Sequence, residues 1–217
     1  MLRFMSIAAI CLLTTSVAHA QKYAEPSGAS SSKFSVQGAT LIYNSNDVGS
    51  DAYPEIDGPD VDELRAHLRR NSNINTLQLT STGGLVWAGD EMARIVLDYG
   101  LNTRVVDECS SSCVMIFLAG EDRVLTSGSK IGFHQNSWSS GGAQSYFKDW
   151  RDAEGWRNPF DFASWLYQDT QHETAAQLEF MVSRGVDPSF AIETKKYRPV
   201  MWFPTRQELR NAGVINR

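Results

Sequence analysis

Three features of the sequence contain residue types that can carry out acyl transfer: the pair Gly83-Gly84, Ser111 and His134. A serine hydroxyl becomes a nucleophile when an imidazole accepts its proton and later returns that proton to the leaving group. Glycines at a turn can leave backbone N–H groups free to stabilise an oxyanion. Each feature alone is typical of ordinary structure, so the chemistry depends on whether the fold brings the three together.

The pattern around each feature predicts the element that positions it. Residues 75–80 alternate apolar and polar side chains as a strand does, and Gly83-Gly84 follows where that pattern ends. Ser111 precedes the apolar run 114–119, which predicts a buried helix. The N-terminus of that helix would stabilise developing negative charge, and the N–H of Ser112 could be a second oxyanion donor.

His134 comes directly after a short predicted strand, in which Ile131 and Phe133 lie on one side. We expect the imidazole to face the other side, at the edge of the same sheet. Other strands are predicted at 34–36, 40–43, 104–106 and 123–125. Helices are predicted from Asp60 or Asp62 to Arg70, and at 88–99, 159–182, 188 onward and 205–211, with a loop at 136–155. This order indicates an α/β domain with largely parallel pairing.

In this order and at nearly this spacing, the segments resemble the proteolytic subunit of the Clp protease. The segments that carry the resemblance are 77–84, Ser111 ahead of 117–120, 131–135 and the closing stretch 202–216. The resemblance implies a ClpP/crotonase-like spiral of ββα units, with residues 34–217 as a single domain. The small-Ser-small-Cys pattern around Ser111 is similar to exported relatives of that family.

The resemblance also implies a role for each residue. Ser111 matches the nucleophile, His134 the base, and Gly83, Gly84 and Ser112 the oxyanion-binding positions. An ungapped count from the glycines instead places Cys113 at the nucleophile position, so this residue is a rival. The implied function is serine hydrolase activity on a peptide or protein substrate, without a cofactor or metal.

The position of the family's third catalytic residue, an acid, is occupied here by Met201, which cannot orient a histidine by hydrogen bonding. Asp187 and Glu193 are the nearest acids upstream and are possible third members. The alternative function is therefore a catalytically inactive binding or assembly protein with the same fold. A crotonase-type acyl-CoA enzyme shares the fold as well, but coenzyme A is not expected outside the cytoplasm.

Cys109 and Cys113 are four residues apart, on either side of Ser111. On a helical turn this spacing separates Cα atoms by roughly 6 Å, which a disulfide tolerates. We expect a disulfide in an oxidising compartment rather than two free thiols. A metal site is not expected, because the sequence provides no set of four ligands nearby.

The N-terminus has the pattern of a signal peptide at residues 1–20, with Arg3, an apolar run at 7–13 and the cleavage pattern Ala18-His19-Ala20. The expected mature chain is periplasmic or secreted, begins near Gln21 with a flexible tail to residue 33, and has no further membrane segment. The net charge of −5 and the absence of a basic stripe argue against nucleic acid as a partner. The resemblance implies a homo-oligomer, and the aromatic stretch 138–167 is predicted to form core or subunit interface.

Overall fold

The computed structural model describes residues 33–48 and 53–217. The predicted signal peptide at 1–20 lies outside the described residues, as does nearly all of the predicted tail at 21–33. The predicted strands near residues 34 and 40 are the first elements of the described chain.

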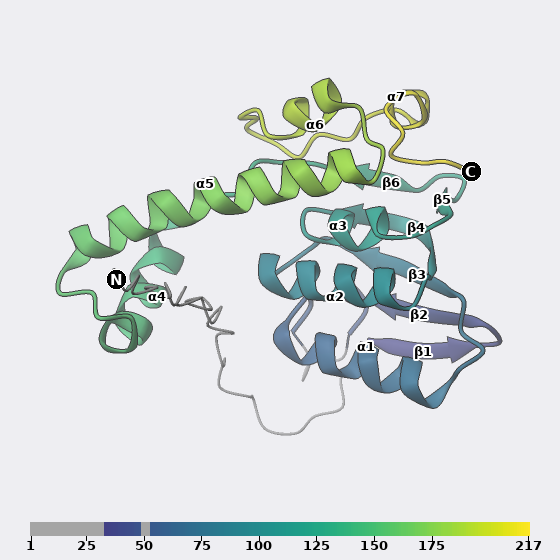
Figure 1. Cartoon of the computed structure of the whole chain (residues 1–217), viewed down its shortest axis with the longest axis horizontal. Helices are drawn as coiled ribbons and strands as arrows, with labels where there is room; N and C mark the ends of the chain where they lie inside the picture. The colour runs from purple at the N-terminus through teal and green to yellow at the C-terminus, as the bar shows by residue number, and fades with distance from the viewer. Residues whose placement is uncertain (1–32, 49–52) are drawn as a thin grey trace, which may run out of the picture.

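A six-stranded sheet forms the centre of the molecule (Figure 1). Its first five strands lie side by side in chain order, and the sixth pairs with the fourth. All pairs are parallel except the first, which is an antiparallel hairpin. The α/β class with a mostly parallel sheet is therefore confirmed. The strands are β1 (Phe34–Gln37), β2 (Thr40–Asn44), β3 (Thr76–Ser81), β4 (Asn102–Ser110), β5 (Arg123–Leu125) and β6 (Lys130–Gly132).

Strand β4 is longer than predicted, and an irregularity divides it between two neighbours. Asp107 has a φ of 64°, a backbone conformation that Asp tolerates better than most residues, and its N–H donates to Ser129 Oγ at 2.8 Å. Before this point β4 pairs with β5, and after it β4 pairs with β6. The division brings the strand that leads into His134 directly beside the end of β4.

Seven helices are present in the described chain: α1 (Gly58–Arg70), α2 (Val86–Asp98), α3 (Cys113–Leu118), α4 (Ser140–Glu154), α5 (Pro159–Ser183), α6 (Pro188–Thr194) and α7 (Arg206–Asn211). Helices α1, α2 and α3 lie along one face of the sheet (Figure 1). The long helix α5 extends beyond the sheet. Helix α4 lies near the N-terminal end of α5, away from the sheet.

The core lies between the sheet and helices α1 to α3. In β3 the side chains alternate, so that Leu77 and Leu79 are fully buried while their neighbours are partly exposed. All six side chains of α3 are buried, as the apolar run predicted. Burial of this much apolar surface, at about 25 cal/mol per Å², fixes α3 in place and with it the turn that carries Ser111.

Two arginines close the C-terminal end of α3. Arg184 Nε donates to Leu118 O at 3.0 Å. Arg123 Nε and Nη2 donate to Val214 O at 3.0 Å and Gly213 O at 2.8 Å, and its Nη1 approaches the carbonyls at the end of α3. A cation at the C-terminal end of a helix complements its dipole. The C-terminal segment is thereby linked to the helix that follows the serine.

The predicted loop at 136–155 is wrong, because most of it is helix α4. Ser139 caps this helix by accepting a hydrogen bond from the Gly142 N–H at 2.9 Å, and Gly155 ends it with a φ of 71°. The glycines in its first turn lower its intrinsic helix propensity, and none of its residues is buried. Aromatic packing against α5 stabilises the helix instead, including the stacked rings of Tyr146 and Trp165 at 5.8 Å.

The predicted start of α1 at Asp60 or Asp62 is also wrong. Asp57 is the N-cap residue, and the Asp60 side chain completes a capping box by accepting a hydrogen bond from the Asp57 N–H at 2.9 Å. Asp60 also pairs with Lys33 at 2.9 Å and accepts a bond from Tyr43 Oη at 2.7 Å. This acid is therefore part of a buried polar network inside the helix rather than its cap.

Candidate active site

Ser111 lies on a sharp turn between β4 and α3. Its φ of 56° is in the left-handed region, which costs an L-residue roughly 1–2 kcal/mol. The turn is held on both sides, because the Ser111 N–H donates to Gly132 O at 3.0 Å and its C=O accepts from the Val114 N–H at 3.0 Å. Strand, turn and buried helix together fix the serine in a strained conformation, which is frequent at functional sites.

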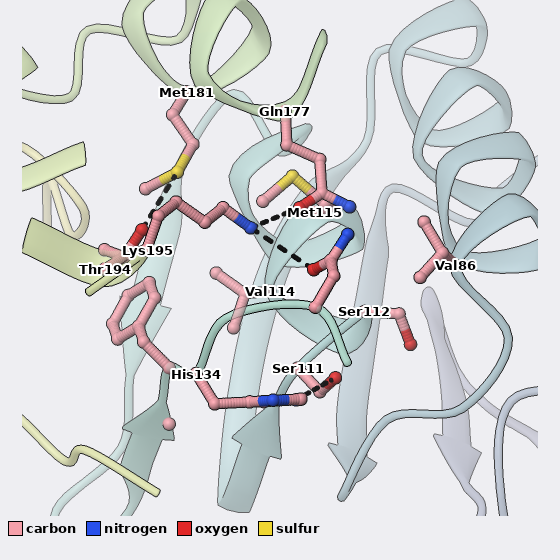
Figure 2. Close-up of a pocket in the computed structure, with 13 residues that line it drawn as sticks. Val86, Ser111, Ser112, Val114, Met115, His134, Gln177, Met181, Thr194 and Lys195 are labelled. Carbon is pink, nitrogen blue, oxygen red and sulfur yellow. Dashed lines mark hydrogen bonds between the residues drawn. The ribbon is translucent and has the colours of Figure 1, made fainter. Parts of the chain in front are cut away.

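His134 contacts this serine directly. Its Nε2 lies 2.7 Å from Ser111 Oγ, and both side chains are only partly buried (Figure 2). The histidine follows β6, and the preceding residue Phe133 exchanges two backbone hydrogen bonds with Trp202, at 2.8 and 2.9 Å. The predicted pair of Ser111 and His134 is therefore brought together at the carboxyl ends of neighbouring strands.

Gly83 and Gly84 pass closely over the serine turn. Their φ values are 109° and 150°, a region that side chains rarely adopt. A Cβ on Gly83 would lie 2.6 Å from Ser111 Cβ, and one on Gly84 would lie 2.3 Å from Ile56 O. Only glycine fits at either position, because a larger residue would push Ser111 or the backbone of Ile56 aside.

Hydrogen bonds distinguish the possible oxyanion donors. The Gly83 N–H donates to Ser81 Oγ at 3.1 Å, so this group already has an acceptor. The N–H groups of Gly84 and Ser112 donate no hydrogen bond to another residue in the described part of the chain. Ser112 Oγ donates to Gly84 O at 3.2 Å, which joins the serine turn to the glycine loop. Gly84 and Ser112 are therefore the two donors of the predicted three that remain available.

Met201 lies opposite His134. The antiparallel bridge between Phe133 and Trp202 places residues 134 and 201 across from each other, and Met201 Cγ lies close to Gly132. A thioether is at most a weak hydrogen-bond acceptor. The two nearest predicted acids have other partners: Asp187 caps α6 by accepting from the Phe190 N–H at 2.9 Å, and Glu193 pairs with Lys196 and Arg198.

Among the described residues, no carboxylate is a hydrogen-bond partner of His134. The histidine and serine therefore form a pair rather than a triad in this structure.

A disulfide joins Cys109 and Cys113, with their Cα atoms 5.4 Å apart. The half-cystines do not share a helical turn, because Cys109 lies near the end of β4 and Cys113 begins α3. The bond therefore closes the strand-to-helix turn around Ser111. Both side chains are fully buried. A bonded sulfur is not a nucleophilic thiolate, so Cys113 does not compete with Ser111 while the bond is intact.

A pocket opens beside the serine–histidine pair (Figure 2). Its walls come from the turn after β4, the segment after β6 and helices α2, α3, α5 and α6, including Val86, Ser111, Ser112, Met115, His134, Asn136, Gln177, Met181 and Lys195. Burial lowers the pKa of Lys195 from 10.5 to about 8. Nothing in the sequence indicated that Lys195 and Gln177 lie here, because they are distant in the chain from Ser111 and form no motif with it.

Within residues 33–48 and 53–217, no group of three or more His, Cys, Asp or Glu side chains is arranged to hold a metal ion. The same part of the chain contains no helix that is both long and apolar enough to span a bilayer.

Comparison with solved structures identifies the architecture. A mutant of ClpP1 from Listeria monocytogenes matches with a TM-score of 0.56, over 82% of this chain and 89% of that chain. The chain has a ClpP-like fold. Sequence identity over the match is 14%, so the likeness concerns the fold alone. No protein-family model matches the sequence, and no curated protein matches it. A ClpP-like fold does not by itself determine a reaction, so the chemistry of this chain depends on the residues of its own site.

Proposed function

We propose that this chain is an exported ClpP-like serine hydrolase that cleaves peptides, with Ser111 as nucleophile and His134 as base. The observation that carries the proposal is the 2.7 Å contact between Ser111 Oγ and His134 Nε2 on a strained turn between a strand and a helix. The distance is within hydrogen-bond reach for proton transfer. The ClpP-like fold supports the class of reaction by analogy only.

The geometry supports a two-step reaction. His134 Nε2 accepts the hydroxyl proton as Ser111 Oγ attacks the peptide carbonyl, and the N–H groups of Gly84 and Ser112 stabilise the resulting oxyanion. The tetrahedral intermediate collapses when His134 returns the proton to the leaving amine, and an acyl-serine remains. Water then attacks the acyl-serine with His134 again as base, which releases the acid and restores the hydroxyl.

No carboxylate among the described residues hydrogen-bonds to His134, and this limits the chemistry. In a triad the carboxylate fixes the tautomer of the imidazole and stabilises its protonated form. Met201 provides neither effect, so we expect acylation to be slow in comparison with a complete triad. The same residue favours a second candidate function, a ClpP-like binding or assembly protein that has lost turnover.

A fluorophosphonate probe tests the proposal, because an activated serine oxygen attacks its phosphorus and displaces fluoride to leave a stable phosphonyl-serine. We expect labelling at Ser111, loss of labelling in Ser111→Ala, and a large decrease in His134→Ala. Ser183→Ala is the control, since Ser183 is exposed at the end of α5, outside the site, and its hydroxyl donates to Phe180 O in its own helix. If the oxidised and the reduced protein both remain unlabelled at Ser111, the binding or assembly function replaces the enzymatic one.

The proposal includes export and self-association. The sequence pattern at residues 1–20 supports export, and the mass of the exported protein would show whether cleavage occurs before Gln21. Exposed aromatic residues on the projecting helix α5 support a homo-oligomer, including Phe160 and Tyr167, which are 84% and 71% exposed.

A further inference from the structure

The pocket beside Ser111 contains a lysine whose ammonium group has only neutral acceptors. Lys195 Nζ donates to Gln177 Oε1, and to Asn136 Oδ1 at 3.5 Å. Figure 2 shows Lys195 and Gln177 on the far side of Val114 from His134 and Ser111. Among the ion pairs of the described residues, none includes Lys195.

Lys195 is partly buried, and a charge that is partly withdrawn from water is ordinarily paired with an opposite charge. Burial is the main cause that lowers the pKa of Lys195, yet at about 8 the group is still mostly protonated at neutral pH. One ammonium group has three donors, and two of them have amide acceptors. The third donor and the net positive charge are available to a ligand that enters the pocket.

Two carboxyl groups lie near enough to influence Lys195 without contacting it. Asp90 on α2 has a pKa raised to about 6 by burial, and burial also raises the pKa of Glu173 on α5. Asn136 separates Glu173 from Lys195, because its Nδ2 donates to Glu173 Oε2 at 3.4 Å while its Oδ1 accepts from the lysine. These acids help to keep the lysine protonated, but neither occupies its ion-pairing position.

The size of the pocket limits what can enter. The cavity is small, about 20 Å³, which is enough for a water molecule or one small polar group. Met115 and Met181 line the pocket, and their flexible side chains can adjust around the stem of a ligand. A carboxylate is small enough to enter this pocket. Its negative charge and its acceptor oxygens would supply the ion-pair partner that Lys195 lacks.

We propose that the pocket selects peptides with a carboxylate side chain on the residue whose carbonyl is attacked, and that Lys195 is the specificity-determining residue. This inference rests on the proposed hydrolase function. The acyl part of a substrate stays bonded to Ser111, so its side chain is the group placed beside the pocket wall formed by Ser111 and Ser112. A side-chain carboxylate long enough to pass Val114 would reach the ammonium and form the ion pair that neither Asp90 nor Glu173 forms with it.

Reversible peptide aldehydes test the inference, because they form a hemiacetal with an activated serine and need no turnover. The measurement is the aldehyde concentration that halves the rate of fluorophosphonate labelling of Ser111 at pH 7. We expect N-acetyl-alanyl-alanyl-glutamyl aldehyde to act at an approximately tenfold lower concentration than its glutaminyl analogue. Lys195→Met should remove this difference, and Lys195→Arg should retain most of it. Lys196→Met is the matched control, since Lys196 is exposed and outside the pocket.

Each other outcome contradicts the inference in a distinguishable way. Equal protection by the glutamyl and glutaminyl aldehydes, with Ser111 labelled, would overturn the inference and leave the hydrolase proposal standing. Stronger protection by a lysyl aldehyde would mean that Asp90 and Glu173 set the preference. If the free acid N-acetyl-alanyl-alanyl-glutamine protects far better than its amide, the carboxylate recognised is a peptide C-terminus instead. Absence of any labelling of Ser111 would refute the hydrolase proposal itself.

Discussion

The side chain opposite His134 determines how firmly the imidazole is held. Met201 fills this position with a thioether, while the histidine already contacts Ser111 through Nε2. An imidazole that lacks a partner on its other nitrogen can change tautomer or rotate away. Ser111 is therefore held by more contacts in this structure than the imidazole of His134, which we propose as its base.

Met201→Asp should supply the missing partner. We expect the rate of fluorophosphonate labelling at Ser111 to increase by about tenfold or more, because the orienting carboxylate of a triad contributes up to about 10⁴ in rate. Met201→Asn is the control for size, and it should give little increase because a neutral amide does not stabilise the imidazolium. A folded Met201→Asp protein that labels no faster than the parent would show that residue 201 does not act on His134.

Asp90 contributes a pH dependence to stability. Its folded pKa of about 6 is above the ordinary value of 3.8, so the folded state binds the proton more tightly than the unfolded state. Stability therefore decreases as pH rises from about 4 through about 6, and it remains lower above that range. The largest loss that this pKa implies is about 3 kcal/mol.

Asp90→Asn should consequently raise the free energy of unfolding at pH 7.5 by about 1–2 kcal/mol, and with it the melting temperature. At pH 4 the substitution should have much less effect. The gain is smaller than the full value because the substitution also removes an attraction to Lys195. Thermal unfolding at the two pH values is the measurement. Asp98→Asn, on the exposed end of the same helix, should change neither. Equal effects of Asp90→Asn at both pH values would contradict the interpretation.

At the scale of the elements, the turn between β4 and α3 is the one that a disulfide constrains. The Cys109–Cys113 bond closes a loop of only a few residues, so its effect on unfolding should be small, at most about 2 kcal/mol. Its larger effect should be on the conformation of Ser111, whose positive φ the bond helps to maintain.

The double variant Cys109→Ala/Cys113→Ala should therefore lose most of the Ser111 labelling and change its melting temperature by only a few degrees. Labelling and thermal unfolding of the same preparation separate the two effects. Reduction of the parent with dithiothreitol should reproduce the loss, and reduction of the variant should have no further effect. Undiminished labelling of a well-folded variant would show that packing of α3 alone maintains the turn.

Strand β3, helix α3 and strand β6 were predictable, because apolar alternation and apolar runs define them directly in the sequence, whereas the extension of β4 to Ser110 was not. Helix α4 was not, since its exposed first turn contains Gly141 and Gly142 and its stability comes from contacts with α5. The pocket side of the site was not predictable either. Lys195 reaches Asn136 and Gln177 only after α5 and α6 have packed, and no local pattern encodes that contact.

At the scale of the whole molecule, the pair of α4 and α5 is the main departure from a rounded shape (Figure 1). Its aromatic residues form a small core of their own, in which Trp156 lies 4.9 Å from both Phe162 and Trp165. Phe160 and Tyr167 remain exposed on the same face of α5, because they are seven residues apart. An exposed aromatic face of this kind is typical of a subunit interface.

Phe160→Ser/Tyr167→Ser should therefore convert the oligomer to smaller species without unfolding the domain, because neither side chain belongs to the aromatic core. Sedimentation velocity would measure the size of the particles, and circular dichroism would check the fold. Val200→Ser is a suitable control, since Val200 is 72% exposed but lies far from α5 in the chain. A parent protein that sediments as a monomer at all concentrations would exclude the oligomer.

The link between Arg123 and the C-terminal segment affects how the protein can be made and handled. The carbonyls of Gly213 and Val214 accept hydrogen bonds from the Arg123 guanidinium. Asn216 Oδ1 accepts a hydrogen bond from the Arg123 N–H at 2.7 Å. These contacts cannot form until residues 213–216 have been synthesised, so α3 cannot complete its packing before then. Removal of residues 213–216 would disturb the packing that holds Ser111, even though Ser111 lies about a hundred residues away in the chain.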